Sequence, residues 1–338
     1  MQNLKELLFR LCGAPGVAGC ETAAAEQAAR ELSPYARVET DALGNVAAHL
    51  GKPDAKEHIL LDAHNDQIGL IITGVDKDGF LCMDRCGGVD RRVVPGAPVL
   101  VYGREVLTGI VSCMPPHLME AGEKKLESVE KLRIDVGLSR EEAEQLVSPG
   151  DRALLWSRPA SLLGSRVTCA ALDDRCGAAA LIRCAELLQG AELNCQVTIL
   201  LSAMEEIGGQ GARVGAYAAQ ATRAIAVDVS FAHQPGVPKE NTGVLGGGPM
   251  IGIAPILNRE MARELTALAE KLDMPHTTEV MGGRTSTNSD ELAVARGGVR
   301  TALVSIPLRY MHTAVEVIDL RDVEYTARLL AEYVKGVK

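Results

Sequence analysis

The sequence predicts an α/β fold: a doubly wound, mostly parallel sheet that carries an inserted small β-barrel domain. After residue 173, short apolar runs alternate with amphipathic helical segments, the pattern of parallel strands covered by helices. Between residues 67 and 165 the pattern changes to short Val-, Ile- and Gly-rich runs separated by Gly and Pro, typical of a small barrel or sandwich. At 338 residues, the chain exceeds what one hydrophobic core usually holds. We therefore expect a main domain of residues 1–66 and 166–338, with residues 67–165 inserted into it.

The first part of the main domain reads as helices followed by strands. Residues 1–33 predict two helices, and residues 37–46 predict a strand, a tight turn at Gly44-Asn45 and a second strand. Residues 58–63 form a short apolar run suited to a buried strand. This run leads directly into His64-Asn65-Asp66.

The insert is expected to consist of short strands and one helix. Strands are predicted at 69–73, 99–102 and 106–112, and a capping box at Ser139 opens a helix that reaches Leu146. An inserted β domain exposes strand edges and apolar surface unless something covers them. We therefore expect residues 67–165 to serve dimerisation and assembly rather than chemistry.

The second part of the main domain alternates helix and strand. Helices are expected at 174–189, 209–220, 258–272 and from about 322 onward, and strands at 196–202, 224–228 and 301–306. Such alternation favours βαβ units with helices on both faces of the sheet.

Composition excludes several kinds of partner. The formal net charge is −9 and no long Lys/Arg run occurs, so nucleic acid and anionic membranes are poor partners. No apolar run is long enough to span a bilayer. The nine cysteines form no CxxC pair and indicate reduced thiols in a cytoplasmic protein.

Asp173-Asp174 stands where a helix is expected to begin. One aspartate there is explained by helix capping. A second carboxylate beside it needs a partner of its own, and a divalent cation is a natural one. Both explanations remain open on this segment alone.

Other chemistry-bearing residues follow predicted strands in the same way. Carboxyl ends of parallel strands gather at one edge of a sheet, where ligands bind. Each residue alone has an ordinary structural explanation, but together they provide enough imidazole and carboxylate ligands for two zinc, cobalt or manganese ions that share one carboxylate. The set comprises His64, Asp173, Glu205, Glu206, Asp228 and His312.

Glu205 and Glu206 suggest separate roles. Neighbouring residues of an extended chain point in opposite directions. One of the two can therefore face a metal ion while its neighbour faces the space above it, and a metal-facing Glu206 with a water-facing Glu205 would give a ligand and a general base.

The motifs around these residues resemble a known family. They are Ala63-His-Asn-Asp-Gln-Ile-Gly69, Ala171-Leu-Asp-Asp-Arg-Cys-Gly177, Glu205-Glu-Ile-Gly208, Ala226-Val-Asp-Val229 and Arg309-Tyr-Met-His-Thr313. Together, over nearly the whole chain, they resemble the dinuclear metal aminopeptidases that form tetrahedral shells. That family includes glutamyl, leucyl, lysyl and deblocking aminopeptidases, and some members carry the label endoglucanase.

The resemblance implies two divalent metal ions per subunit, Zn²⁺ or Co²⁺. It implies that Asp173 bridges them, that His64 and Asp228 complete one site, and that Glu206 and His312 complete the other. It also implies a non-proline cis peptide bond between Asp173 and Asp174.

The resemblance further implies a chemistry and an assembly. A bridging hydroxide would attack the scissile carbonyl, Glu205 would be the general base, and Asp66 would orient His64. The substrates would be short peptides, cleaved after their first residue, and dimers would build a dodecamer. The chain departs from the family pattern at Gln67, at Asn288-Ser-Asp290 and at Ala314, none of which is a proposed ligand.

Other functions stay open on the sequence. An N-acyl amino acid deacetylase could use the same metal scaffold, and a non-catalytic relative could retain the site as a relic. An endoglucanase needs two carboxylates that flank one bond, and the low aromatic content of 3% gives few platforms for sugar rings. The first-residue preference is not readable, although Arg284, Arg296 or Arg309 could favour acidic substrates.

Overall fold

An eight-stranded sheet forms the centre of the main domain. The computed structural model describes residues 1–115, 117 and 127–337, so part of the predicted insert lies outside the described residues. The strands of the sheet are β1 (Arg37–Thr40), β2 (Val46–Gly51), β3 (His58–His64), β12 (Gln196–Ser202), β13 (Arg223–Phe231), β14 (Met250–Ile253), β15 (Thr277–Val280) and β16 (Arg300–Leu308). Their order is β1-β2-β12-β3-β13-β16-β14-β15.

The sheet is mixed, with a parallel centre. Strands β12, β3, β13 and β16 run parallel to one another. Antiparallel pairs join β1 to β2, β2 to β12 and β14 to β16. The parallel centre brings the carboxyl ends of four strands to one edge, as the sequence predicted.

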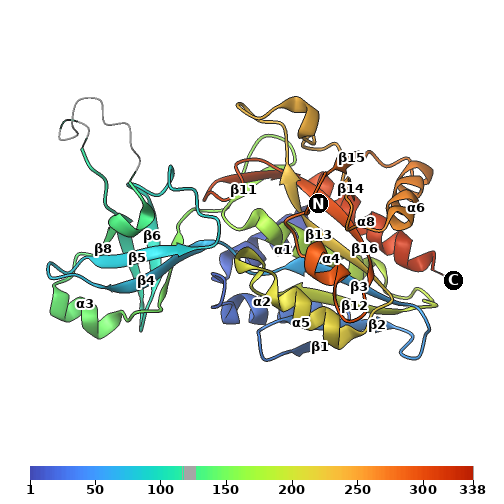
Figure 1. Cartoon of the computed structure of the whole chain (residues 1–338), viewed down its shortest axis with the longest axis horizontal. Helices are drawn as coiled ribbons and strands as arrows, with labels where there is room; N and C mark the ends of the chain where they lie inside the picture. Colours follow the sequence, from blue (N-terminus) through green and yellow to red (C-terminus); the bar gives the residue numbers. More distant parts are fainter. Residues whose placement is uncertain (116, 118–126, 338) are drawn as a thin grey trace.

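Helices cover both faces of this sheet (Figure 1). All seven residues of β3 are buried, which explains its uninterrupted apolar run. Ile59 and Leu61 pack into the larger core, whereas Leu60 packs into the core on the opposite face. The larger core includes α1 (Gln2–Gly13), α2 (Thr22–Leu32), α4 (Leu172–Leu187), α6 (Arg259–Lys271) and α8 (Leu320–Lys335), and the smaller one α5 (Gln210–Ala219) and α7 (Ser289–Ala293). The doubly wound α/β prediction is therefore confirmed.

The insert contains a closed six-stranded barrel that stands apart from the main sheet (Figure 1). Its strands are β4 (Gly69–Val75), β5 (Leu81–Cys86), β6 (Pro98–Tyr102), β7 (Val106–Val111), β8 (Arg133–Asp135) and β9 (Arg152–Leu155). They enclose a separate apolar core. Ser139 caps α3 (Arg140–Leu146) in the predicted capping box.

Closure changes one expectation about the insert. A closed barrel has no free strand edges, so the expected edge exposure is wrong. Apolar side chains nevertheless face outward, because Val106 and Ile110 of β7 are 58% and 49% exposed.

A small sheet connects the insert to the main domain. It consists of β10 (Ala160–Ser161), β11 (Arg166–Cys169) and β17 (Glu316–Asp319). The loop between β16 and β17 carries His312. Among the helices that the structure describes, none combines the length and apolar character needed to cross a membrane.

Candidate metal centre

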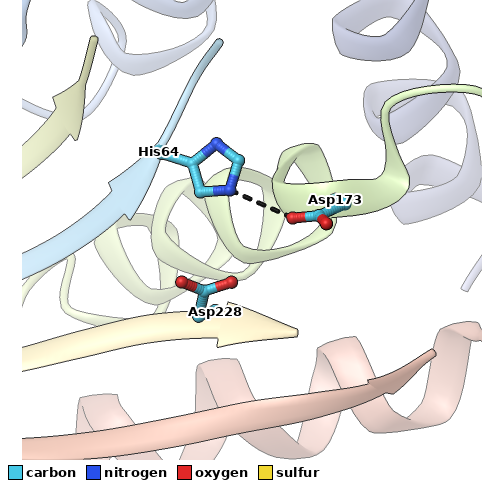
Figure 2. Close-up of side chains that lie close together, drawn as sticks. All are labelled: His64, Asp173 and Asp228. Atoms are coloured by element: carbon cyan, nitrogen blue, oxygen red, sulfur yellow. Dashed lines mark hydrogen bonds and ion pairs between the residues drawn. The ribbon is translucent and has the colours of Figure 1, made fainter. Parts of the chain in front are cut away.

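Two strand ends place His64 and Asp228 beside each other. His64 is the last residue of β3, which pairs in parallel with β13. Ala226 is in register with Asp62, so Asp228 stands level with His64 two residues further along. Figure 2 shows Asp173, from the start of α4, approaching the same two side chains.

These three residues form the first cluster. His64 Nε2 lies 3.0 Å from Asp173 Oδ1. One donor atom from each of His64, Asp173 and Asp228 falls within 4.8 Å of the others, and all three residues are buried. One imidazole nitrogen and two carboxylates suit a zinc-like ion.

A second cluster adjoins the first and uses the other oxygen of Asp173. Asp173 Oδ2 lies 3.4 Å from His312 Nε2, which lies 3.6 Å from Glu206 Oε2. Donor atoms of Asp173, Glu206 and His312 also fall within 4.8 Å of one another. The structure thus brings together all five predicted ligands, with Asp173 common to both clusters.

The backbone at Asp173 has the expected unusual form. Asp173 and Asp174 have non-helical dihedral angles at the start of α4, and the peptide bond between them is cis. The cis bond that the resemblance implied is therefore confirmed.

Glu205 lies at the same cavity but outside both clusters. The cavity measures about 660 Å³ and is lined by Glu205, Glu206 and the other candidate ligands. Glu205 and Glu206 belong to a 3₁₀ turn, η3 (Glu205–Ile207), so the premise that they are extended neighbours is wrong. The two side chains still point in different directions, because successive residues of a 3₁₀ helix are rotated by about 120° around the helix axis.

Asp66 holds this turn in place. Its Oδ1 accepts a hydrogen bond from Glu205 N at 3.0 Å, and its Oδ2 accepts one from Glu206 N at 3.1 Å. His64 Nδ1 lies 3.2 Å from the Asp66 carbonyl oxygen and 3.5 Å from Asp66 Oδ1. Asp66 therefore contacts His64 as predicted, and its carboxylate also fixes the backbone of both glutamates.

Glu316 makes a similar arrangement that the sequence did not indicate. Glu316 Oε2 accepts a hydrogen bond from Asp173 N at 3.1 Å, and Oε1 accepts one from His312 N at 3.0 Å. Its side chain is buried. In the sequence, Glu316 is marked only by its position directly before the apolar residues Val317-Ile318, and this position did not indicate a role at the site.

The insert also reaches the site, through Gly88. His312 Nδ1 lies 3.0 Å from Gly88 O. A Cβ atom on Gly88 would lie 2.5 Å from His312 Nδ1, closer than van der Waals contact permits. Backbone from the insert therefore fixes the imidazole of one candidate ligand.

The electrostatics of the site favour a cation. Burial raises the pKa of Asp173, but hydrogen bonds with His312 and His64 outweigh it and hold that pKa below its usual range. Burial raises the pKa of Asp228 and Glu206 well above normal, and nearby carboxylates add to the effect. Burial likewise raises the pKa of Glu205 to about 7. Divalent cations would offset this concentration of negative charge, so the residues present fit two metal ions.

A parallel-centred α/β sheet with adjoining His–carboxylate clusters at its strand ends is the arrangement expected of a metal-dependent hydrolase. Comparison with known proteins specifies the family. The family described as M42 glutamyl aminopeptidase matches residues 44–329. The chain belongs to this family and is a hydrolase that acts as an aminopeptidase.

Individual relatives agree with this assignment. The lysyl aminopeptidase of Pyrococcus furiosus is 32% identical over 98% of this chain and 97% of its own length. An aminopeptidase structure from Desulfurococcus kamchatkensis has a TM-score of 0.93 and 30% identity, covering 100% of this chain and 96% of that one. A Pyrococcus horikoshii TET1 peptidase, described as assembling into a tetrahedron or a large octahedral shell, has a TM-score of 0.88 and 32% identity, covering 99% of this chain and 100% of that one.

Proposed function

We propose that this aminopeptidase uses two divalent metal ions, Zn²⁺ or Co²⁺, to remove the first residue from short peptides. The observation that carries the proposal is the position of Asp173, whose two oxygens face two separate ligand clusters. His64 and Asp228 would hold one ion, and Glu206 and His312 the other.

The bound ions would polarise the scissile carbonyl and lower the pKa of the attacking water. Glu205 faces the cavity without belonging to either cluster, so its carboxylate is free to accept the proton of that water. The same group then returns the proton to the departing amine. Asp66 keeps Glu205 in position through the backbone of η3.

The first test is removal of metal. Exhaustive chelation should abolish hydrolysis of aminoacyl p-nitroanilides, and added zinc or cobalt should restore it. Elemental analysis confirms that the treated protein lacks metal. Full activity in protein shown to be free of metal would refute the proposal.

An N-acyl amino acid deacetylase remains the second candidate, because the same metal ligands could serve it. Assays of matched free and N-acetylated peptides separate the two functions. The endoglucanase alternative has less support, because a glycosidase holds one bond between two carboxylates roughly 5–9.5 Å apart. Here Asp173, Glu206 and Asp228 instead converge with histidines in clusters within 4.8 Å.

We also propose that the chain forms a homo-oligomer in the cytoplasm, a dodecamer built from dimers, with residues 67–165 as the assembly domain. The relative that forms closed shells and the outward apolar residues Val106 and Ile110 support the assembly. The nine free cysteines support the location.

A further inference from the structure

We infer that Glu279 makes this enzyme select peptides whose first residue carries a cationic side chain, lysine or arginine. The inference rests on the proposed function and concerns the part of the cavity beyond the candidate metal ligands. There the wall is formed by Ser230, Phe231, Glu279 and Met281, among others.

Strand geometry connects Glu279 to the metal centre. Ser230 follows Asp228 by two residues on β13, so both side chains point to the same face, about 7 Å apart along the strand. Ser230 Oγ donates a hydrogen bond to Glu279 Oε1. Through Ser230, the Glu279 carboxylate therefore stands at roughly the reach of one long side chain from Asp228, one of the candidate metal ligands.

Apart from the candidate ligands, Glu205 and Glu279, the charged residues of the cavity wall are paired. Arg284 Nε lies 3.3 Å from Asp290 Oδ2, and Arg284 Nη2 lies 3.9 Å from Glu291 Oε1. Glu291 Oε2 also accepts a hydrogen bond from Arg213 at 2.7 Å. These two carboxylates and two guanidinium groups form one compensated set.

Glu279 differs from that set. Within the described part of the chain, it has no ion-pair partner within 4.0 Å, and its contact is the neutral hydroxyl of Ser230. Its charge is thus left to be matched by something that enters the cavity.

The apolar part of the cavity wall suits the stem of a lysine or arginine. Phe231, Met281 and Met311 line the cavity and give apolar surface. Long cationic side chains pack their methylene groups on such surface and place the charge at its end. An acidic first residue would meet Glu279 as a like charge, and the carboxylates of Asp290 and Glu291 beside Arg284 offset the attraction that this guanidinium could provide.

The test compares lysyl, leucyl and glutamyl p-nitroanilides on metal-loaded enzyme. Wild-type protein should show the highest kcat/KM for the lysyl substrate and the lowest for the glutamyl one. Glu279→Gln keeps the side-chain shape and removes the charge. It should lower the lysyl-to-leucyl ratio of kcat/KM about 10- to 100-fold, the range for a hydrogen bond to a charged group.

A binding measurement gives a second readout. Free L-lysine should inhibit leucyl hydrolysis competitively in wild-type protein and much more weakly in Glu279→Gln. Glu270→Gln, on α6 outside the cavity, makes the same change in net charge and should leave both readouts as in wild type.

The outcomes separate this inference from the proposed function. Loss of all aminopeptidase activity on metal-loaded wild-type protein would contradict the proposed function itself. Leucyl hydrolysis with no lysyl preference, or a ratio unchanged by Glu279→Gln, would overturn only the role of Glu279. Leucyl hydrolysis by the variant also shows that it has folded.

Discussion

Glu205 and Glu206 are neighbours in the chain but occupy different parts of the site. Glu206 shares a donor cluster with Asp173 and His312, whereas Glu205 lies outside both clusters. The backbone N–H groups of both glutamates are fixed by the single carboxylate of Asp66. Their side chains can therefore be changed separately without releasing the turn that carries them.

This separation predicts opposite results for two conservative variants. Glu205→Gln should retain both metal ions but lose about 10²-fold or more in kcat, because it removes the proposed proton acceptor. Asp173→Asn should lose metal, because it weakens the ligand common to both clusters. Elemental analysis and steady-state kinetics of the two purified proteins test this. An empty site in Glu205→Gln with full metal in Asp173→Asn would reverse the assigned roles.

The candidate metal ligands could be predicted from the sequence, whereas the residues that hold those ligands in position could be predicted only in part. His64 and Asp228 stand at the ends of apolar strand segments, and Asp173 stands at the start of a helical segment. Because the carboxyl ends of parallel strands lie at one edge of a sheet, these three residues were expected to converge. Glu316 acts through backbone N–H groups of residues distant in sequence. Such a contact leaves no local pattern. Gly88 contributes a carbonyl oxygen, which every residue type has.

At the scale of the element, β3 carries a buried histidine at the end opposite the metal centre. His58 Nε2 lies 2.9 Å from Thr198 Oγ1 on the adjacent strand β12, and only 7% of His58 is exposed. Burial, with a smaller contribution from the charge of His49, lowers the pKa of His58 to about 4. Between this pKa and its usual value, His58 is therefore neutral in the folded protein but protonated in the unfolded chain.

This exclusion gives a pH dependence of stability. Between the unfolded pKa of about 6.5 and the folded value of about 4, the unfolded state binds the extra proton. The free energy of unfolding should therefore fall as pH decreases through this window. His58→Gln should fall less steeply than wild type over the same window. Urea unfolding of both proteins in metal-free form measures the difference, and equal slopes would contradict this role for His58.

The long buried elements were predictable, whereas several of the short ones were not. The strands near 58–64, 196–202 and 301–306 have strong apolar runs and lie close to their expected bounds. By contrast, β14, β15 and β17 have four residues each and α7 has five, too few for a periodic pattern to emerge. Their conformations are set by pairing with longer strands and by packing.

For the whole molecule, the barrel and the main domain meet at the candidate metal centre. Gly88 of the insert contacts His312 of the main domain, while outward residues of β7 leave apolar surface uncovered in one chain. The insert thus contributes to the site and carries exposed apolar residues that the proposed assembly would cover. The sequence predicted a barrel here but not this contact, because no motif encodes the docking of two domains.

Assembly can be measured directly. Light scattering on active, metal-loaded protein should give the mass of a dodecamer, against 35.8 kDa for one chain. A dimer would retain the proposed twofold interface but contradict the closed shell. A monomer mass at micromolar concentration with activity intact would refute any requirement for assembly.

The strand order of the main sheet also determines when its parts can form during synthesis. The neighbours of β3 are β12 and β13, both encoded after the barrel. The six barrel strands, in contrast, pair only with one another among the described residues. As the nascent chain leaves the ribosome, the barrel can close while β3, apolar on both faces, still lacks any sheet partner. Until β12 emerges, His64 and Asp66 belong to an unfolded segment tethered to a finished barrel, so the metal centre is among the last features to form.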